Sequence, residues 1–174
     1  MIIKDKQFEL LIKEEDIIKV IDSIALKINE DYKEKEVTFI IILDGAYMFA
    51  SDLLKKIDLK CNISFAKYSS YKGTKSTGLF KEKLGIPEDI RNKNIIVIED
   101  IVDTGFTIKN IIEKIKIFKP LSLEVAALFY KPDVCSKVFI PKYNGIGIPN
   151  DFIVGYGLDY ENYGRNLKDV YSLI

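Results

Sequence analysis

The sequence lacks histidine and tryptophan altogether, and only two of its 174 residues are arginines, Arg91 and Arg165. Without histidine, the chain cannot form a Ser-His-Asp triad, a Cys-His pair, an HExxH zinc helix or any histidine-ligated metal site. Any proton transfer at neutral pH must therefore fall to another group, such as a carboxylate. The two arginines matter because a planar guanidinium is well suited to bidentate contact with phosphate.

The chain also lacks an excess charge of either sign. Lysine plus arginine and aspartate plus glutamate both total 26, so the formal net charge is zero. A nucleic-acid binder needs a concentrated positive face, and the sequence shows none, so we expect no nucleic-acid partner.

Cysteine and long apolar runs are scarce as well. Cys61 and Cys135 stand far apart, outside the CxxC spacing of zinc ribbons and thioredoxin-type sites. Few cysteines and many lysines are typical of a reducing compartment, so we expect a cytoplasmic protein. No apolar run approaches the roughly 20 residues that cross a bilayer, and we expect no membrane partner.

The apolar residues, 48% of the chain, follow an alternating order of strands and helices. Residues 14–35 repeat isoleucines at helical spacing, and helices are also expected over 47–56 and 107–118. Nearly unbroken β-branched runs predict buried strands. The expected strands cover residues 37–43, 62–68, 94–99, 122–130 and, more briefly, 151–158. No linker or repeat divides the chain, so residues 1–174 are expected to form one α/β domain around a mostly parallel sheet.

The stretch from Ile95 to Ile108, IIVIEDIVDTGFTI, combines features that suit a sugar phosphate. A buried strand runs into acidic residues and then into a helix, at the sheet edge where α/β proteins bind ligands. Gly105 permits a tight turn, and the N-terminus of the following helix offers N–H groups to a phosphate. The neighbouring carboxylates could bind sugar hydroxyls.

Other interpretations of this stretch are open from the residues alone. Aspartate and threonine are common helix caps, so a DTGxT segment can serve the helix only. The spacing does not fit the GxxxxGK[ST] phosphate loop, no GxGxxG occurs, and the acids are too far apart for a DxDx[TV] motif.

The string VIEDIVDTGFTI closely resembles the phosphoribosyl-pyrophosphate motif of the type I phosphoribosyltransferases. Three further segments resemble the hypoxanthine(-guanine) branch of that family, in the same order along the chain from about residue 40 to 167. They are LDGAYMF at 43–49, SSY at 69–71 with the later STG at 76–78, and DFIVGYGLDY at 151–160 followed by Arg165. The resemblance implies the type I fold, in which helices flank a twisted sheet and a small hood is built from residues 140–174 and the N-terminus.

The resemblance also implies an activity. Members transfer 5-phosphoribosyl from phosphoribosyl pyrophosphate to N9 of a 6-oxopurine with Mg²⁺, so hypoxanthine would give IMP and guanine would give GMP. The polar segment 69–87, with Ser70 and Tyr71 near its hinge, resembles a flexible lid, in keeping with the functional or mobile character of such long loops. Members form homodimers or homotetramers, and the helix that follows Gly45 is a candidate interface.

Site residues are implied one by one. Glu99 and Asp100 match acids that bind ribose hydroxyls and, together with Asp159, the metal. Asp103 matches the general acid/base that faces the purine nitrogens. The 5-phosphate would lie against the backbone and hydroxyls of the segment from 103 to 107, which comprises Asp103, Thr104, Gly105, Phe106 and Thr107. Phe106 stands where some relatives have lysine, a change that backbone binding should tolerate.

The purine would contact Lys131, Phe152, Ile153 and Asp159, and Arg165 would reach the pyrophosphate. Lys131 matches the donor to the 6-oxo group, Phe152 the stacking ring and Ile153 a backbone contact to the ring edge. From the residues alone, Lys131 is more often a solvated lysine at a strand end, Phe152 is expected to be a core aromatic, and Arg165 is ordinarily part of a surface ion pair.

Asp44 is the clearest departure from the family pattern, because many relatives have a basic residue there to meet pyrophosphate. The backbone N–H groups of Asp44 and Gly45 could still bind that anion. The resemblance predicts a cis peptide between Leu43 and Asp44, and a site that depends more on Mg²⁺ and backbone amides.

Two other functions stay open. A regulator built on this fold could bind phosphoribosyl pyrophosphate or a nucleotide without catalysis, and a related salvage enzyme could use another base. The presence of Asp103 together with the base-contacting residues favours the enzyme.

Overall fold

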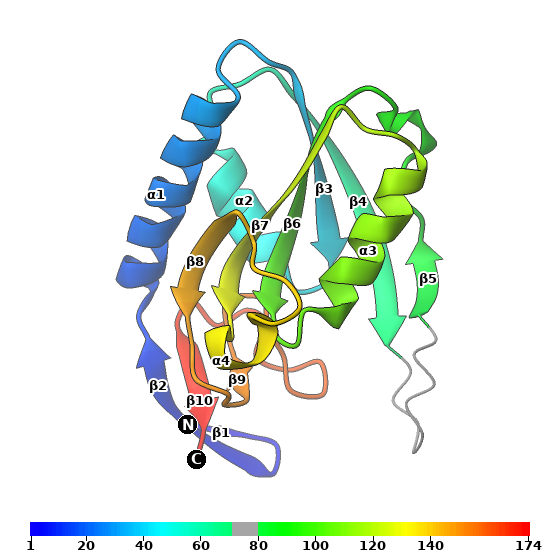
Figure 1. Ribbon diagram of the computed structural model, residues 1–174. Helices are drawn as coiled ribbons and strands as arrows, with labels where there is room; N and C mark the ends of the chain where they lie inside the picture. The colour runs from blue at the N-terminus through cyan, green and yellow to red at the C-terminus, as the bar shows by residue number, and fades with distance from the viewer. Residues whose placement is uncertain (71–79) are drawn as a thin grey trace.

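The computed structural model describes residues 1–70 and 80–174, which form two sheets (Figure 1). The main sheet has the strand order β5-β4-β3-β6-β7-β8. Its strands are β3 (Val37–Leu43), β4 (Cys61–Ser70), β5 (Phe80–Leu84), β6 (Asn94–Val102), β7 (Ser122–Tyr130) and β8 (Tyr143–Gly147). All neighbours are parallel except β4 and β5, which pair antiparallel at one edge.

Helices cover both faces of this sheet, and alternate residues of β3 show how. Phe39 and Ile41 pack into one core cluster with α1 (Glu14–Asp31) and α2 (Tyr47–Leu54). Ile40 and Ile42 point the other way, into a second cluster with α3 (Phe106–Ile117). Burial on both faces explains why β3 is apolar throughout, rather than alternating. Two short helices complete the elements, η1 (Glu88–Ile90) and α4 (Pro132–Cys135).

The ends of the chain form the second sheet, in the order β1-β2-β10-β9. Its strands are β1 (Ile2–Ile3), β2 (Lys6–Ile12), β10 (Val170–Leu173) and β9 (Ile153–Val154). Figure 1 shows this sheet beyond the carboxyl ends of β6, β7 and β8, with both termini close together. We call these four strands, together with residues 155–169 between β9 and β10, the hood. The hood therefore faces the carboxyl edge of the main sheet, where Gly157 lies against Gly45.

Most predicted elements are confirmed, and β3 and β7 have the predicted bounds. The helix expected to reach residue 35 ends at Asp31, and the strand expected over 151–158 is limited to Ile153–Val154. The hood expected from residue 140 begins later, because Tyr143–Gly147 joins the main sheet as β8.

The predicted lid, 69–87, contains the end of β4, β5 and residues up to Pro87, and its central residues 71–79 lie outside the described part. Among the described residues, no helix is long and apolar enough to cross a membrane.

Candidate active site

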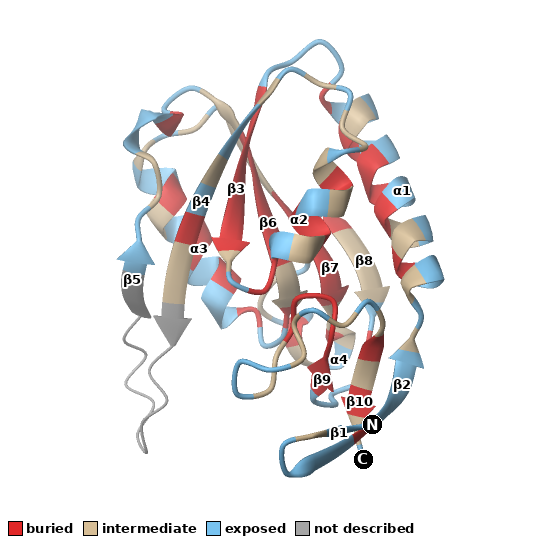
Figure 2. Cartoon of the chain, turned by 180° about the vertical axis from the view of Figure 1, so that it is seen from behind, coloured by how far each residue is buried: buried red, intermediate tan, exposed pale blue. Residues whose placement is uncertain are grey.

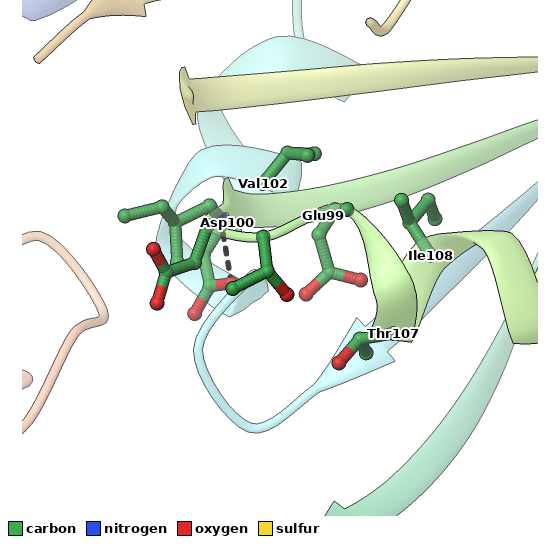
Figure 3. Close-up of a pocket in the computed structure, with 9 residues that line it drawn as sticks. Glu99, Asp100, Val102, Thr107 and Ile108 are labelled. Carbon is green, nitrogen blue, oxygen red and sulfur yellow. Dashed lines mark hydrogen bonds between the residues drawn. The ribbon is translucent and has the colours of Figure 1, made fainter. Parts of the chain in front are cut away.

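A pocket of about 270 Å³ opens where β6 passes into α3, at the carboxyl edge of the main sheet. It is lined by nine residues between positions 99 and 108: Glu99, Asp100, Ile101, Val102, Asp103, Thr104, Gly105, Thr107 and Ile108. Figure 3 shows the carboxylates of Glu99 and Asp100 and the hydroxyl of Thr107 on the same side of the strand. The motif singled out in the sequence therefore forms one continuous wall of a pocket.

The start of α3 is built to receive an anion. Gly105 precedes the helix with φ of 82°, a left-handed conformation that favours glycine, and no side chain caps the helix at this position. The N–H groups of a first helical turn have no acceptor within the helix, and the dipole is positive there. Phe106 is 62% exposed and is not among the residues that line the pocket.

Glu99 and Asp100 bring two carboxyl groups into a dry environment. Only 8% of Glu99 is exposed, and its Oε2 is buried with no hydrogen-bond partner. Burial, reinforced by the neighbouring Asp100, raises the pKa of Glu99 well above its usual range. Burial also raises the pKa of Asp100, although a hydrogen bond with Glu99, a hydrogen bond from the Ile101 N–H (2.7 Å) and the charge of Arg165 oppose that rise. An orphaned buried oxygen beside a second carboxylate suits a sugar hydroxyl or Mg²⁺.

The loop after β3, residues 44–46, lies directly against these acids. The peptide between Leu43 and Asp44 is cis, as predicted. A Cβ atom on Gly45 would overlap the Asp100 carboxylate, and a Cβ atom on Gly157 would overlap the Gly45 carbonyl oxygen. Glycine is therefore required at both positions for the loop to fit between the acidic strand end and the hood.

Arg165 makes hydrogen bonds and an ion pair within the hood, beside this loop. Its guanidinium donates to the Gly157 carbonyl (2.7 Å) and pairs with Asp159 (2.6 Å). The Arg165 carbonyl accepts hydrogen bonds from the Gly157 N–H (2.9 Å) and the Tyr47 hydroxyl (3.2 Å). The arginine and its partner Asp159 are each 26% exposed, so this is a partly buried pair. A fixed guanidinium is thereby placed beside the loop predicted to meet pyrophosphate.

Lys131 pairs with Asp103, one of the residues that line the pocket. Lys131 follows β7, and its backbone N–H donates to the Val102 carbonyl (3.0 Å). Its Nζ lies 3.1 Å from Asp103 Oδ1 and 3.3 Å from Asn150 Oδ1. Only 10% of the Lys131 side chain is exposed, against 55% for Asp103. Lys131 is thus a held cation and not a solvated lysine, while the carboxylate beside it faces the open side of the site.

Phe152, directly before β9, is an exposed aromatic residue. Phe152 is 46% exposed, and its ring meets Tyr160 edge-on at 5.9 Å between centroids, with an interplanar angle of 84°. Phe152 is therefore not a core residue, and one part of its ring remains open to a ligand. Ile153 is buried in β9, so it can offer a ligand only its backbone.

The structure does not bring Asp159, Glu99 and Asp100 together as a metal site. Within residues 1–70 and 80–174, no three acidic or cysteine side chains are arranged to hold a metal ion. The Asp159 carboxylate is instead engaged by Arg165 and by the Asn162 N–H (2.7 Å). The assignment of Asp159, Glu99 and Asp100 to the metal therefore stays a prediction, and in this fold the Asp159 carboxylate is paired with Arg165.

Three functional candidates escape sequence reasoning. Asn150 holds Lys131, Gly157 makes room for the loop at 44–46, and Lys67 pairs with Asp44. Only Gly157 has a signal in the sequence, within the GYG segment. Of the predicted lid residues, Ser70 is the last residue of β4, and Tyr71 lies outside the described residues.

Comparisons with known proteins agree with this geometry. A phosphoribosyl transferase domain model matches residues 10–161. A hypoxanthine-guanine phosphoribosyltransferase of Staphylococcus epidermidis is 41% identical to this chain, over 94% of this chain and 92% of its own length. One of Staphylococcus aureus is 40% identical, over 95% of this chain and 93% of its own length.

Two solved structures are similar to the whole chain. A hypoxanthine phosphoribosyltransferase from Staphylococcus aureus has a TM-score of 0.90 at 40% identity, covering 98% of this chain and 92% of its own. A hypoxanthine-guanine phosphoribosyltransferase from Bacillus anthracis has a TM-score of 0.89 at 34% identity, covering 97% and 98%.

Proposed function

The chain belongs to the phosphoribosyl transferase domain family, and we propose that it is a cytoplasmic purine-salvage enzyme that uses hypoxanthine and guanine. The reaction transfers the 5-phosphoribosyl group of phosphoribosyl pyrophosphate to N9 of the base. The bond from C1′ to the pyrophosphate oxygen breaks, the C1′–N9 bond forms, and IMP or GMP leaves with pyrophosphate. The relatives that carry these names support the substrate class, and the two unpaired cysteines suit a reducing compartment.

The start of α3 would hold the 5-phosphate of the sugar. Its first-turn N–H groups, together with the hydroxyls of Thr104 and Thr107, supply donors around the pocket. Glu99 and Asp100 would accept hydrogen bonds from the ribose hydroxyls. As pyrophosphate departs, positive charge develops on the ribose ring, and two carboxylates fixed beside it stabilise that charge without reorganising.

The pair of Lys131 and Asp103 would recognise and activate the purine. Lys131 Nζ can donate to the 6-oxo group, and Asp103 can accept the proton that the base loses from N7 as N9 attacks C1′. Asn150 keeps the ammonium in place, and Phe152 offers a ring face to the base. This pairing of a buried cation with an exposed carboxylate, beside a phosphate cradle, is the observation that carries the proposal.

Mg²⁺ fits the residues at the ribose end. Glu99 and Asp100 present carboxylate oxygens, one of them orphaned, and the substrate's phosphates would supply further oxygen ligands. When bound, the ion neutralises charge on the leaving pyrophosphate.

A direct test supplies hypoxanthine, guanine, xanthine and adenine separately with phosphoribosyl pyrophosphate and Mg²⁺, and follows nucleotide formation by absorbance. We expect product with hypoxanthine and guanine. Product only with xanthine or adenine would make this a related salvage enzyme with another base. Binding of phosphoribosyl pyrophosphate without any product would favour a ligand-binding regulator.

We also propose that the chain forms a homo-oligomer through α2 and the adjoining part of β4. Ile63 and Phe65 lie on the α2 face of β4, because Phe65 pairs with Ile41, and they stay 51% and 46% exposed. Figure 2 shows that β4, unlike β3, is only partly buried. Tyr47 at the start of α2 is 42% exposed. Light scattering should give at least a dimer, and a monomer at micromolar concentration would contradict this.

A further inference from the structure

Lys67 makes the closest contact to the residue that departs from the family pattern. Its Nζ lies 2.6 Å from Oδ1 and 2.8 Å from Oδ2 of Asp44. The register of the parallel strands explains the pairing, because Lys67 of β4 lies opposite Leu43, the last residue of β3. The ammonium is therefore fixed at the entrance of the loop at 44–46 by strand pairing and by a two-oxygen ion pair.

This loop lies between two cations. On the side of the hood, Arg165 donates to Gly157, whose α-carbon lies directly against the Gly45 carbonyl. On the side of β4, Lys67 pairs with Asp44. Each cation is oriented by one carboxylate, Asp159 for Arg165 and Asp44 for Lys67. The loop thus has a positive group at each side, although its own side chain is acidic.

The charges decide what this arrangement can bind. An isolated Asp44 carboxylate would repel the diphosphate of phosphoribosyl pyrophosphate. Paired with Lys67, it is neutralised, and the ammonium has three donors, so it can keep Asp44 and still donate to a phosphate oxygen. The Lys67 side chain is 33% exposed, which leaves it accessible to a ligand. Partly exposed ion pairs contribute little to stability, so rearranging this pair when a ligand binds requires little free energy.

We propose that Lys67 is a positioning residue for the diphosphate of phosphoribosyl pyrophosphate, held in place by Asp44. The positive charge that many relatives place in the loop itself is supplied here by the neighbouring strand. The inference rests on the proposed function, because it assigns a role toward that reaction's substrate.

Calorimetry with magnesium pyrophosphate tests the inference directly. We expect the wild-type chain to bind, and Lys67→Met to weaken binding by about 10- to 100-fold, the range for a hydrogen bond to a charged group. Lys67→Arg should keep the affinity within a few-fold. Lys60→Met is the matched control, because Lys60 precedes β4, is 84% exposed and pairs with Glu36, and it should bind as the wild type does.

Steady-state kinetics should separate a loss of diphosphate binding from a general loss of structure. In Lys67→Met, KM for phosphoribosyl pyrophosphate should rise by a similar factor, while KM for hypoxanthine and the melting temperature stay near the wild-type values. The inference is overturned if Lys67→Met changes both KM values together. It is also overturned if Lys67→Met does not fold and Lys67→Arg is equally impaired.

The double variant Asp44→Asn/Lys67→Met identifies what Lys67 contacts. If Lys67 meets the diphosphate, the double variant escapes the repulsion by an unpaired Asp44 but still binds pyrophosphate more weakly than the wild type. If Lys67 only neutralises Asp44, the double variant regains wild-type affinity, and the inference is wrong. A wild-type chain that binds neither pyrophosphate nor phosphoribosyl pyrophosphate would overturn the proposed function as well. Wild-type binding with an unaffected Lys67→Met would overturn this inference alone.

Discussion

Replacing Glu99 by glutamine should stabilise the ligand-free protein, and the gain should increase with pH. Burial raises the pKa of Glu99 well above its usual range, so the folded chain keeps this proton to higher pH than the unfolded chain does. Unfolded glutamate titrates near pH 4.3. Above that value the unfolded state has released the proton while the folded state still holds it, so rising pH favours unfolding. Glutamine resembles protonated glutamate and does not titrate.

The size of the gain follows from the cost of charging this buried carboxyl in the folded chain, because neutral glutamate and glutamine share the cost of burying an unpaired oxygen. Glu99 Oε2 is buried without a partner, and leaving a buried polar group unsatisfied costs about 1–3 kcal/mol, more when it is charged. The difference between Glu99→Gln and wild type should therefore be near zero at pH about 4.5 and reach about 1–3 kcal/mol at pH 8. For a chain of this length, each kcal/mol corresponds to roughly 2–4 °C in Tm.

Thermal unfolding with a chelator between pH 4.5 and 8 measures this difference. The matched control is Glu113→Gln on α3, where the carboxylate is 61% exposed and pairs with Lys116, so no pH-dependent gain is expected. A Glu99→Gln gain that does not change with pH, or a loss of stability at every pH, would refute the reasoning. The same variant should lose activity by about tenfold or more, because glutamine, unlike the carboxyl group of Glu99, cannot ionise when positive charge develops on the ribose beside it.

Three further predictions test how the site is assembled. Gly157→Ala should lower the free energy of unfolding by at least about 2 kcal/mol and impair catalysis, because φ is 100° and its Cβ would overlap the Gly45 carbonyl. Gly147→Ala, which has room beside Tyr130, should lower it by less than about 1 kcal/mol in urea unfolding. Equal losses of stability in the two variants would contradict this packing. Asn150→Ala should raise KM for hypoxanthine in steady-state assays, because Lys131 loses one of its two acceptors, and should leave KM for phosphoribosyl pyrophosphate unchanged. A rise only in KM for phosphoribosyl pyrophosphate would contradict this role of Asn150. Tyr156→Phe should lower stability by about 1–2 kcal/mol in denaturant titrations, because the buried hydroxyl donates to Asp52 (2.5 Å); unchanged stability would count against a role for this bond in holding the hood on α2.

The core sheet could be predicted because each of its strands carries its own signal. The run VTFIIIL is apolar at every position but one, and residues 122–130 are almost equally so. Both lie between helices with a clear period, so local pattern and tertiary packing agree.

The hood could not be predicted from local pattern. β2 (KQFELLI) buries only Phe8, and β10 has just four residues. These strands exist because the two chain ends pair with each other, as Phe8 does with Leu173. A pairing between residues this far apart leaves no periodic trace in either segment. Only the resemblance to a family indicated that the chain ends form a hood.

The candidate site shows the same division. The segment from Glu99 to Thr107 is contiguous, so its residue types and their order are enough to indicate a phosphate site. Asn150 contacts Lys131 and Lys67 contacts Asp44, and each of these partners is far away in the sequence. Within its own segment, each of the two is an ordinary polar residue. The family resemblance assigns Asp159 to a metal, whereas its pairing with Arg165 in the fold could not be predicted from residue order.

The most direct measurement is IMP formation from hypoxanthine, phosphoribosyl pyrophosphate and Mg²⁺, quantified for wild type, Asp103→Asn and Asp133→Asn. Asp133 lies on α4, two residues after Lys131, and serves as a nearby acidic control. We predict that wild type and Asp133→Asn form IMP at equal rates, and that Asp103→Asn is slower by about 10²- to 10⁴-fold, the usual contribution of a general acid/base. No IMP from the wild type, or an Asp103→Asn variant as fast as wild type, would contradict catalysis at this site.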